Sequence, residues 1–495
     1  MATLIGTAKK DPFTVKESNS VVKAGKGNDV ITVSKGDLSA VWGEAGNDEI
    51  TVGSGVGQGN RAYGDAGADI IKIKGGSYNY ADGGNGIDKI TVSGGSDAAI
   101  RGGSGADSIT VTGGKKNRFY GDAGDDTILV KGGSDNIIYG DDHKKTATGA
   151  DTITITAAAG TGNKIYGEKG IDTINVKGGS KNHIDGGDDG DKITVTGGTD
   201  NKIYGKDGVD NIQINGGNKS NIYGGNDGDE IKINGGSKNY INSGNGKDEI
   251  TVTKGTGNKI LGNSGADTIK VNGGSENNIY GDNDVDIIEI NGGSKNYING
   301  GNDEDEITVT KGTGNKILGS TGADIIKVNG GSENIIYGGN DGDKITLIKG
   351  TNNKIYGHGG MNIIKLNGGS GNLLYGGKDA ERITITGGTG NIIRGNAGND
   401  TININGGEEN TVSGGSGSDT FAFSSGFTKT CTISGYVAAD DLFKFNGAGF
   451  SDYSIAGKDV TLNLDDGGTV KIIGGKGKTL NYEDSNGNRL TLDLK

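Results

Sequence analysis

The stretch GGNDGDEIKINGGSKNYIN, residues 224–242, contains the unit that decides the fold. The turn sequence GGNDGD precedes a segment in which Ile231 and Ile233 alternate with polar residues. A second turn, GGSK, precedes a segment in which Asn239 and Ile241 share a face. Because side chains alternate between the two faces of a strand, we expect one coil of two short strands, with three Ile side chains inside and an Asn at the mouth.

An aspartate at the end of the first turn marks the repeat of this unit. From Asp172 to Asp343 it recurs every 19 residues without a slip. A fixed period of about 20 residues indicates one supersecondary unit stacked many times. The column contains Asp29, Asp48, Asp69, Asp88, Asp107, Asp126, Asp151, Asp172, Asp191, Asp210, Asp229, Asp248, Asp267, Asp286, Asp305, Asp324, Asp343, Asp400 and Asp419. Asn362 and Glu381 take its place between Asp343 and Asp400.

The composition agrees with a thin stack of coils. The chain has 495 residues, 102 of them glycine and one of them proline, and only 31% are hydrophobic. Glycine does not fall at every third position, which excludes collagen, and the fixed places of Ile and Val exclude a disordered linker. Each coil of a solenoid buries only a narrow strip against its neighbours, so a low hydrophobic content suffices.

The sequence divides into three parts. Residues 1–24 form a short leader that could cap the first coil, residues 25–420 are the repeats, and residues 421–495 lose the period and read as a β cap. Three longer intervals, at residues 53–60, 141–151 and 156–163, are predicted to be surface loops that leave the strands in register. We therefore predict an all-β fold, a right-handed parallel β-roll or β-solenoid of about 21 coils with a C-terminal β capping domain.

Several turns match the pattern GGxGxDxUx, where U is an apolar residue. Examples are GGNGIDKIT at 83–91, GGSGADSIT at 102–110 and GGSGSDTFA at 414–422. Over about four fifths of the chain the sequence resembles the RTX family, secreted bacterial proteins built on calcium-binding nonapeptides. The resemblance implies a secreted protein exported by a type I system, with an uncleaved signal between about residue 440 and Lys495.

The chemistry of the turn agrees with calcium as the ligand. Calcium is a hard cation that takes six to eight oxygen ligands, and carboxylates stacked one coil apart would repel each other without a cation. We therefore predict a row of Ca²⁺ ions between stacked coils, held by the 19 aspartates, and a chain that is largely unfolded without calcium. The alternative is a plain β-solenoid whose aspartates cap their turns by accepting hydrogen bonds from backbone amides.

The second turn of each coil carries asparagine instead. This column contains Asn163, Asn182, Asn201, Asn239, Asn258, Asn277, Asn296, Asn315, Asn334, Asn353, Asn372, Asn391 and Asn410. Because asparagine is neutral, it can stack on itself as a ladder of side-chain amides. We expect one calcium row and one asparagine ladder; a second metal row is the alternative. Asn362 and Glu381 are expected to weaken the calcium sites at their coils.

The outward face suggests the partners. Lysines such as Lys202 precede the inward Ile, and tyrosines follow it at Tyr63, Tyr120, Tyr139, Tyr166, Tyr204, Tyr223, Tyr280, Tyr337, Tyr356 and Tyr375. The chain carries −13, and one Ca²⁺ at each aspartate would change this to about +25. We expect self-association into a fibre or lattice, or binding of anionic polysaccharide or lipopolysaccharide. The alternative is that these tyrosines and lysines only cover the sheet and keep the protein soluble. No nucleic-acid partner and no transmembrane segment are expected.

The sequence gives no sign of catalysis. His143, His183 and His358 lie in different coils and accompany no nucleophile motif, and the single cysteine, Cys431, allows no disulfide within the chain. The N-terminus lacks the pattern of a standard signal peptide. We therefore predict a secreted, non-enzymatic, calcium-dependent structural protein of the bacterial surface, matrix or biofilm. An ice-binding or cell- or glycan-binding adhesin module is the alternative; a lyase acting on acidic glycans is a remoter one.

Overall fold

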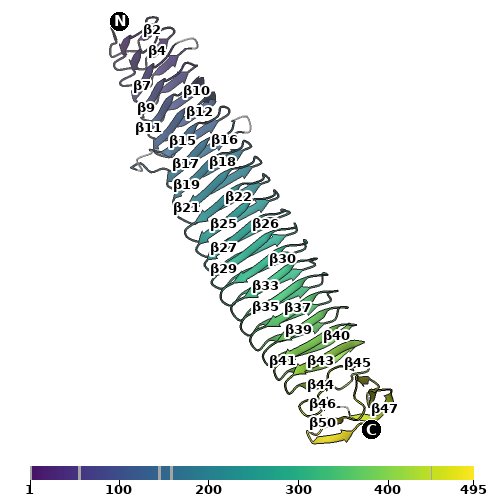
Figure 1. Ribbon diagram of the computed structural model, residues 1–495. Helices are drawn as coiled ribbons and strands as arrows, with labels where there is room; N and C mark the ends of the chain where they lie inside the picture. Colours follow the sequence, from purple (N-terminus) through teal and green to yellow (C-terminus); the bar gives the residue numbers. More distant parts are fainter. Residues whose placement is uncertain (1–2, 54–56, 143–145, 157–159, 448) are drawn as a thin grey trace. The chain divides into compact units, whose positions relative to one another are not determined.

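The computed structural model describes residues 3–53, 57–142, 146–156, 160–447 and 449–495. These residues form strands, turns and connecting segments, and no helix occurs among them. The chain divides into two compact units, Met1–Val252 and Thr253–Lys495. Within each unit the strands stack in coils, as the ribbon shows (Figure 1). The fold is the predicted parallel β-solenoid with a period of about 19 residues.

One coil of the first unit shows the plan. Strand β23 (Asn221–Gly225) leads through the aspartate turn into β24 (Glu230–Asn234), and β24 leads through the asparagine turn into β25 (Tyr240–Asn245). Strand β23 pairs in parallel with β25, so that Ile222 lies beside Ile241. Strand β24 pairs with β22 (Asn211–Asn215) in the same way. In this part of the unit odd-numbered and even-numbered strands therefore form two separate sheets, and each strand residue pairs with the one 19 positions away.

The second unit repeats this plan. Strands β35 (Ile335–Gly339), β37 (Lys354–His358) and β39 (Leu373–Gly377) pair in parallel in one sheet. Strands β36 (Lys344–Ile348) and β38 (Ile363–Asn367) pair in parallel in the other sheet. The aspartate turns again connect the first sheet to the second.

The core is a ladder of aliphatic side chains. Ile222, Ile231, Ile233 and Ile241 have 0% of their surface exposed, as the period-two pattern predicts. Most coils place an aliphatic residue at the same point, so that Ile222 packs beside Ile241 and Ile231 beside Ile212. A buried aliphatic side chain contributes about 1.5–3 kcal/mol relative to an exposed one, so the ladder is the main apolar term that holds the coils together.

The stack contains about 23 turns, two more than predicted, because the parallel pairing extends further at both ends. Residues 1–24 already belong to the coils, because β1 (Thr3–Ile5) pairs with β3 (Val21–Lys23), and β2 (Pro12–Val15) pairs with β4 (Val30–Val33) in the first repeat. Beyond residue 420, β44 (Thr420–Ser424) still pairs in parallel with β46 (Leu442–Asn446). The periodicity in the sequence fades before the coils end.

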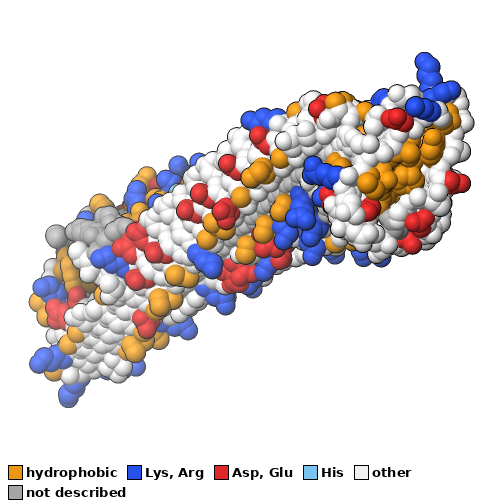
Figure 2. All heavy atoms as spheres, turned by 90° about the horizontal axis from the view of Figure 1, so that it is seen from below, with side chains coloured by type: hydrophobic (Ala, Val, Ile, Leu, Met, Phe, Trp, Pro, Cys, Tyr) orange, Lys and Arg blue, Asp and Glu red, His pale blue; other side chains and the backbone are white. Residues whose placement is uncertain are grey.

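Antiparallel strands follow the last coils of the second unit. Strands β47 (Phe450–Ala456), β48 (Asp459–Leu464) and β49 (Thr469–Ile472) form one antiparallel set, and β50 (Thr479–Glu483) and β51 (Arg489–Asp493) form another. Phe445, Phe450 and Tyr482 pack together between them. Hydrophobic side chains gather at this end of the second unit (Figure 2). Leu490 of β51 is 43% exposed.

The three long intervals keep the strands in register. Glu49 pairs with Ile70, Thr127 with Thr152, and Thr152 with Thr173, so each insertion is accommodated outside the ladders, as predicted. The central residues of the predicted loops, 54–56, 143–145 and 157–159, lie outside the described residues.

Candidate metal-binding row

The aspartate turn brings oxygen atoms inward because glycine allows the coils to approach closely. In the turn that ends at Asp229, Gly225 has a φ of 134°, a conformation that residues with a β-carbon rarely adopt. A β-carbon at this position would collide with the carbonyl oxygen of Lys206 in the coil before. The glycines of the motif therefore permit backbone carbonyls of neighbouring coils to line the interior of the turn.

All 19 predicted aspartates are buried, with at most 2% of their surface exposed. One oxygen of each carboxylate continues the hydrogen bonding between coils. The N–H of Asp172 donates to Oδ1 of Asp191 at 2.8 Å, and the N–H of Asp324 donates to Oδ1 of Asp343 at 2.9 Å. The aspartates thus do cap backbone amides, as the cation-free alternative requires, but only with one of their two oxygens.

The second oxygen, Oδ2, is the unusual atom of the site. In seventeen of the aspartates this atom is buried and meets no hydrogen-bond donor among the described residues. These are Asp29, Asp48, Asp69, Asp88, Asp107, Asp126, Asp151, Asp172, Asp191, Asp210, Asp229, Asp286, Asp305, Asp324, Asp343, Asp400 and Asp419. Asp248 and Asp267, next to the boundary between the units, are buried to the same degree. A buried charged acceptor without a donor is costly, so one occurrence is notable and a row of them points to a missing positive partner.

The neighbours of Oδ2 are oxygen atoms. A β-carbon at Gly338 would collide both with Oδ2 of Asp343 and with the carbonyl oxygen of Gly357, the first residue of the next aspartate turn. The same arrangement recurs at Gly205 with Asp210 and Gly224. Two oxygens from successive coils therefore converge on one small space. Carboxylate and carbonyl oxygens are the ligands that Ca²⁺ prefers, so the residues present fit this ion.

Burial makes ionisation of several of these carboxyl groups unfavourable. It raises the pKa of Asp172 to about 9 and that of Asp191 to about 8. A backbone N–H from the coil before lowers each pKa, and the neighbouring aspartates of the column raise it. Asp324 follows the same pattern, with a pKa of about 8. A positive ion beside Oδ2 would reverse these shifts, because an opposite charge favours the ionised form.

The structure adds two aspartates that the 19-residue spacing misses. The N–H of Asp11 donates to Oδ1 of Asp29 at 2.6 Å, and the N–H of Asp419 donates to Oδ1 of Asp441 at 3.1 Å. In both added residues Oδ2 has a donor. It accepts from the N–H of Thr7 at 2.7 Å in Asp11, and from the N–H of Val437 at 2.7 Å in Asp441. The ends of the column are therefore closed by protein donors, and their spacings of 18 and 22 residues would have revealed them only to a search that tolerates slippage.

The asparagine edge has the same ladder, and where asparagine follows asparagine the second side-chain atom can donate to the next coil. Nδ2 of Asn201, whose neighbour in the next coil is Ser220, is buried without a partner among the described residues. The N–H of Asn334 donates to Oδ1 of Asn353 at 2.9 Å, as in the aspartate column. In addition, Nδ2 of Asn334 donates to Oδ1 of Asn353 at 2.9 Å and to the carbonyl oxygen of Gly312 at 3.0 Å. Such an amide ladder satisfies itself and requires no ion.

Side chains alone do not form a metal centre. Within the described ranges, no three His, Cys, Asp or Glu side chains lie close enough to hold a metal ion together. Any ion in the aspartate row would therefore depend on backbone carbonyls for most of its ligands. His183 and His358 belong to different units, and His143 lies outside the described residues.

The predicted tyrosines form aromatic ladders on the outer face of the odd-numbered strands. In the first unit, Tyr139 stacks on Tyr120 and Tyr166 with ring centroids 5.1 and 5.0 Å apart. In the second unit, Tyr356 stacks on Tyr337 and Tyr375, at 5.1 Å in both cases. Because the ring faces cover each other, the half-buried rings present their edges to the outside.

The comparisons with known proteins add no family. None of the known family models matches the chain, and no curated protein matches it. The resemblance to the RTX family therefore depends on the turn motif alone. No helix among the described residues has the length and apolar character needed to cross a membrane.

Proposed function

We propose that this chain is a secreted, calcium-dependent structural protein of the bacterial cell surface or extracellular matrix. It folds when Ca²⁺ ions enter the row between the coils, and its folded coils assemble into a layer, fibre or biofilm component. The observation that carries the proposal is the row of buried Oδ2 atoms that face carbonyl oxygens and meet no donor among the described residues.

The calcium part of the proposal follows from the energetic balance of the turn. Without a cation, each coil must bury either an unpaired charge or a protonated acid, whereas a bound ion satisfies the carboxylate and the carbonyls together. Because the site does not exist in the unfolded chain, the free energy of binding becomes free energy of folding. In the low calcium of a cell interior the chain would remain largely unfolded, which suits the type I export that the RTX resemblance implies. No catalytic role is proposed.

A circular dichroism titration tests this function directly. Purified protein in EGTA should show little β-structure at neutral pH, and added calcium should restore it. Particle size and negative-stain electron microscopy under both conditions would show whether the folded coils assemble. Full β-structure after exhaustive dialysis against EGTA, with no metal bound, would refute the calcium dependence.

A glycan-binding adhesin is the second candidate, and cations near the aromatic ladder favour it. Lys206 lies over the ring of Tyr204 at 5.5 Å, and Lys316 lies over the rings of Tyr297 and Tyr337 at 5.4 and 5.6 Å. Calcium binding would shift the net charge from −13 to about +25, which favours acidic polysaccharide or lipopolysaccharide. Binding of the calcium-loaded protein to such a polymer at low salt, without assembly of the protein alone, would favour this candidate. Ice binding is less well supported, because the aspartate turns carry no regular row of Thr, Asn and Asp side chains. A thermal hysteresis measurement would test it.

A further inference from the structure

The aspartate column of the second unit changes at two successive coils, where Asn362 and Glu381 occur. Asn362 is fully buried, and its Oδ1 accepts a hydrogen bond from the N–H of Asp343 at 2.9 Å. The same bond, at the same length, connects Asp324 to Asp343 one coil earlier. Asn362 therefore occupies the place in the turn that the aspartates occupy.

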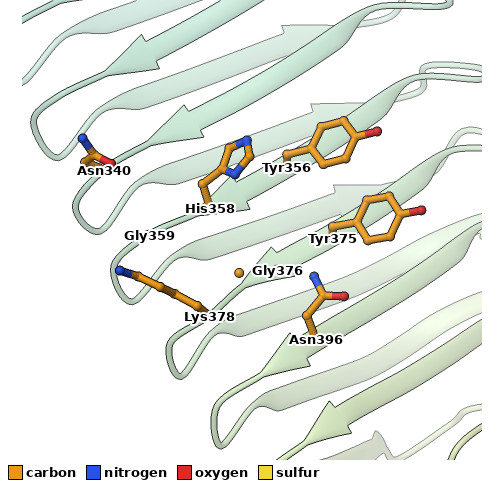
Figure 3. A pocket seen from close by; sticks show the side chains of 9 residues that line it. Asn340, Tyr356, His358, Gly359, Tyr375, Gly376, Lys378 and Asn396 are labelled. Atoms are coloured by element: carbon orange, nitrogen blue, oxygen red, sulfur yellow. The ribbon is translucent and has the colours of Figure 1, made fainter.

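The amide nitrogen of Asn362 lies where the aspartates have Oδ2. A β-carbon at Gly357 would collide with this nitrogen and with the carbonyl oxygen of Gly376, just as one at Gly338 would collide with Oδ2 of Asp343 and the carbonyl oxygen of Gly357. Figure 3 shows the outer side of this region, with His358 and Gly359 on one coil and Gly376 on the next. The two turns thus differ at one atom inside the same carbonyl-lined space.

That atom finds partners only in the asparagine coil. Nδ2 of Asn362 donates to the carbonyl oxygens of Gly360 at 3.1 Å and Gly359 at 3.4 Å. These carbonyls belong to the residues two and three places before Asn362. In the aspartate coils the atom at this place is a carboxylate oxygen, which has no hydrogen to donate when ionised. The neutral amide removes the carboxylate charge and supplies the hydrogen-bond donor that the aspartate side chain lacks.

We propose that Asn362 creates a cation-independent coil, in which the side-chain amide replaces the bound ion and divides the cation row of the second unit into two blocks. The inference depends on the proposed function in one respect, namely that the aspartate coils bind calcium. One block ends at Asp343 and the other begins at Glu381.

The coil after Asn362 resumes the row with a different side chain. The N–H of Glu381 donates to Oδ1 of Asp400 at 2.8 Å, so the ladder continues. Both carboxyl oxygens of Glu381 are buried, and neither meets a hydrogen-bond donor of normal geometry among the described residues. Burial raises the pKa of Glu381 to about 8, the Asp400 carboxyl adds to the rise, and the nearby Asn362 amide opposes it only in part. The Glu381 carboxyl lies beside that of Asp400. The need for a positive partner therefore returns immediately after Asn362, which makes the asparagine coil a boundary between two sets of sites.

Native mass spectrometry of the full chain in calcium tests the inference, because it resolves single bound ions. The Asn362→Asp variant should bind one calcium more than the wild type. The control is Asn352→Asp, which adds the same charge at an exposed position of the preceding turn and should leave the number of bound ions unchanged. Equal calcium counts for Asn362→Asp and the wild type, or failure of Asn362→Asp to fold in saturating calcium, would overturn the inference.

A second variant keeps the test independent of how Asn362→Asp folds. Asn362→Ala removes the amide and should lower the midpoint of urea unfolding in saturating calcium, with the calcium count unchanged. Loss of one ion in this variant would show that the wild-type coil holds a cation, contrary to the inference. A wild type that binds no calcium at all would instead refute the proposed function, so the two failures are distinguishable.

Discussion

Replacing one internal aspartate by asparagine should stabilise the calcium-free protein and leave the stability of the calcium-bound protein nearly unchanged. We consider Asp191→Asn in the first unit. Its Oδ1, which accepts the N–H of Asp172 at 2.8 Å, is retained in asparagine. Its Oδ2, which is buried without a donor among the described residues, becomes an amide nitrogen that can donate to the carbonyls of the turn, as Asn362 does.

The magnitude follows from these two changes. Relieving an unsatisfied buried acceptor is worth about 1–3 kcal/mol, and one added hydrogen bond contributes about 0.5–1.5 kcal/mol. We therefore expect the calcium-free protein to gain roughly 2–4 kcal/mol in its free energy of unfolding. The same substitution removes one ion, and at a free calcium concentration of about 100 times the dissociation constant one ion stabilises the fold by about 2.7 kcal/mol. In calcium the two effects should nearly cancel.

Urea unfolding followed by circular dichroism, in EGTA and in calcium, measures both quantities. Where the wild type does not fold in EGTA, the calcium concentration at the folding midpoint provides the same comparison and should fall for Asp191→Asn. Asp200→Asn is the matched control, because it removes the same charge from an exposed turn of the same unit and should change stability by less than about 0.5 kcal/mol. If Asp191→Asn destabilises the protein in EGTA, or if calcium stabilises it as much as the wild type, the reasoning from the buried Oδ2 is wrong.

Three further predictions follow from the same geometry. First, acid should substitute for calcium, because burial raises the pKa of Asp172 to about 9 and that of Asp305 to about 7. The calcium-free fold should therefore be most stable below about pH 4, the usual pKa of aspartate in an unfolded chain, and should lose stability as the pH rises towards 9. Circular dichroism in EGTA should accordingly show more β-structure at pH 5 than at pH 8, and the opposite order would contradict the assignment of cause. Second, Ile231→Ala should cost about 2–5 kcal/mol in calcium, because it opens a cavity in a fully buried ladder, and native mass spectrometry should find the number of ions unchanged. Third, Tyr139→Ala removes two stacked ring pairs, each worth about 0.5–1.5 kcal/mol, and should lower the thermal midpoint without changing the calcium count; a changed count would connect the aromatic face to the ion row.

The fold could be predicted because the same pattern of turns and alternating apolar residues recurs in nearly every repeat, so that each repeat supports the same assignment. Ile231, Ile233 and Ile241 are buried where the period-two rule places them, and the 19-residue spacing became the register between coils. The number of turns was underestimated, because Asp11 and Asp441 continue the ladder at spacings of 18 and 22 residues. Pairing between coils requires only that two strands lie side by side in register, whatever the length of the chain between them. It therefore continues where the spacing becomes irregular and the sequence period is lost.

For the candidate site, the sequence determined less than it did for the fold. The sequence by itself determined which residue type stacks on which: aspartate on one edge, asparagine on the other, and Asn362 as an exception in the first column. Only the tertiary structure decided what each atom of those side chains meets, since the partners of Oδ2 and Nδ2 are backbone carbonyls whose direction depends on the packing of coil upon coil. For this reason a substitution that in sequence suggested a weakened calcium site became, at Asn362, an amide hydrogen-bonded to the carbonyl oxygens of Gly359 and Gly360.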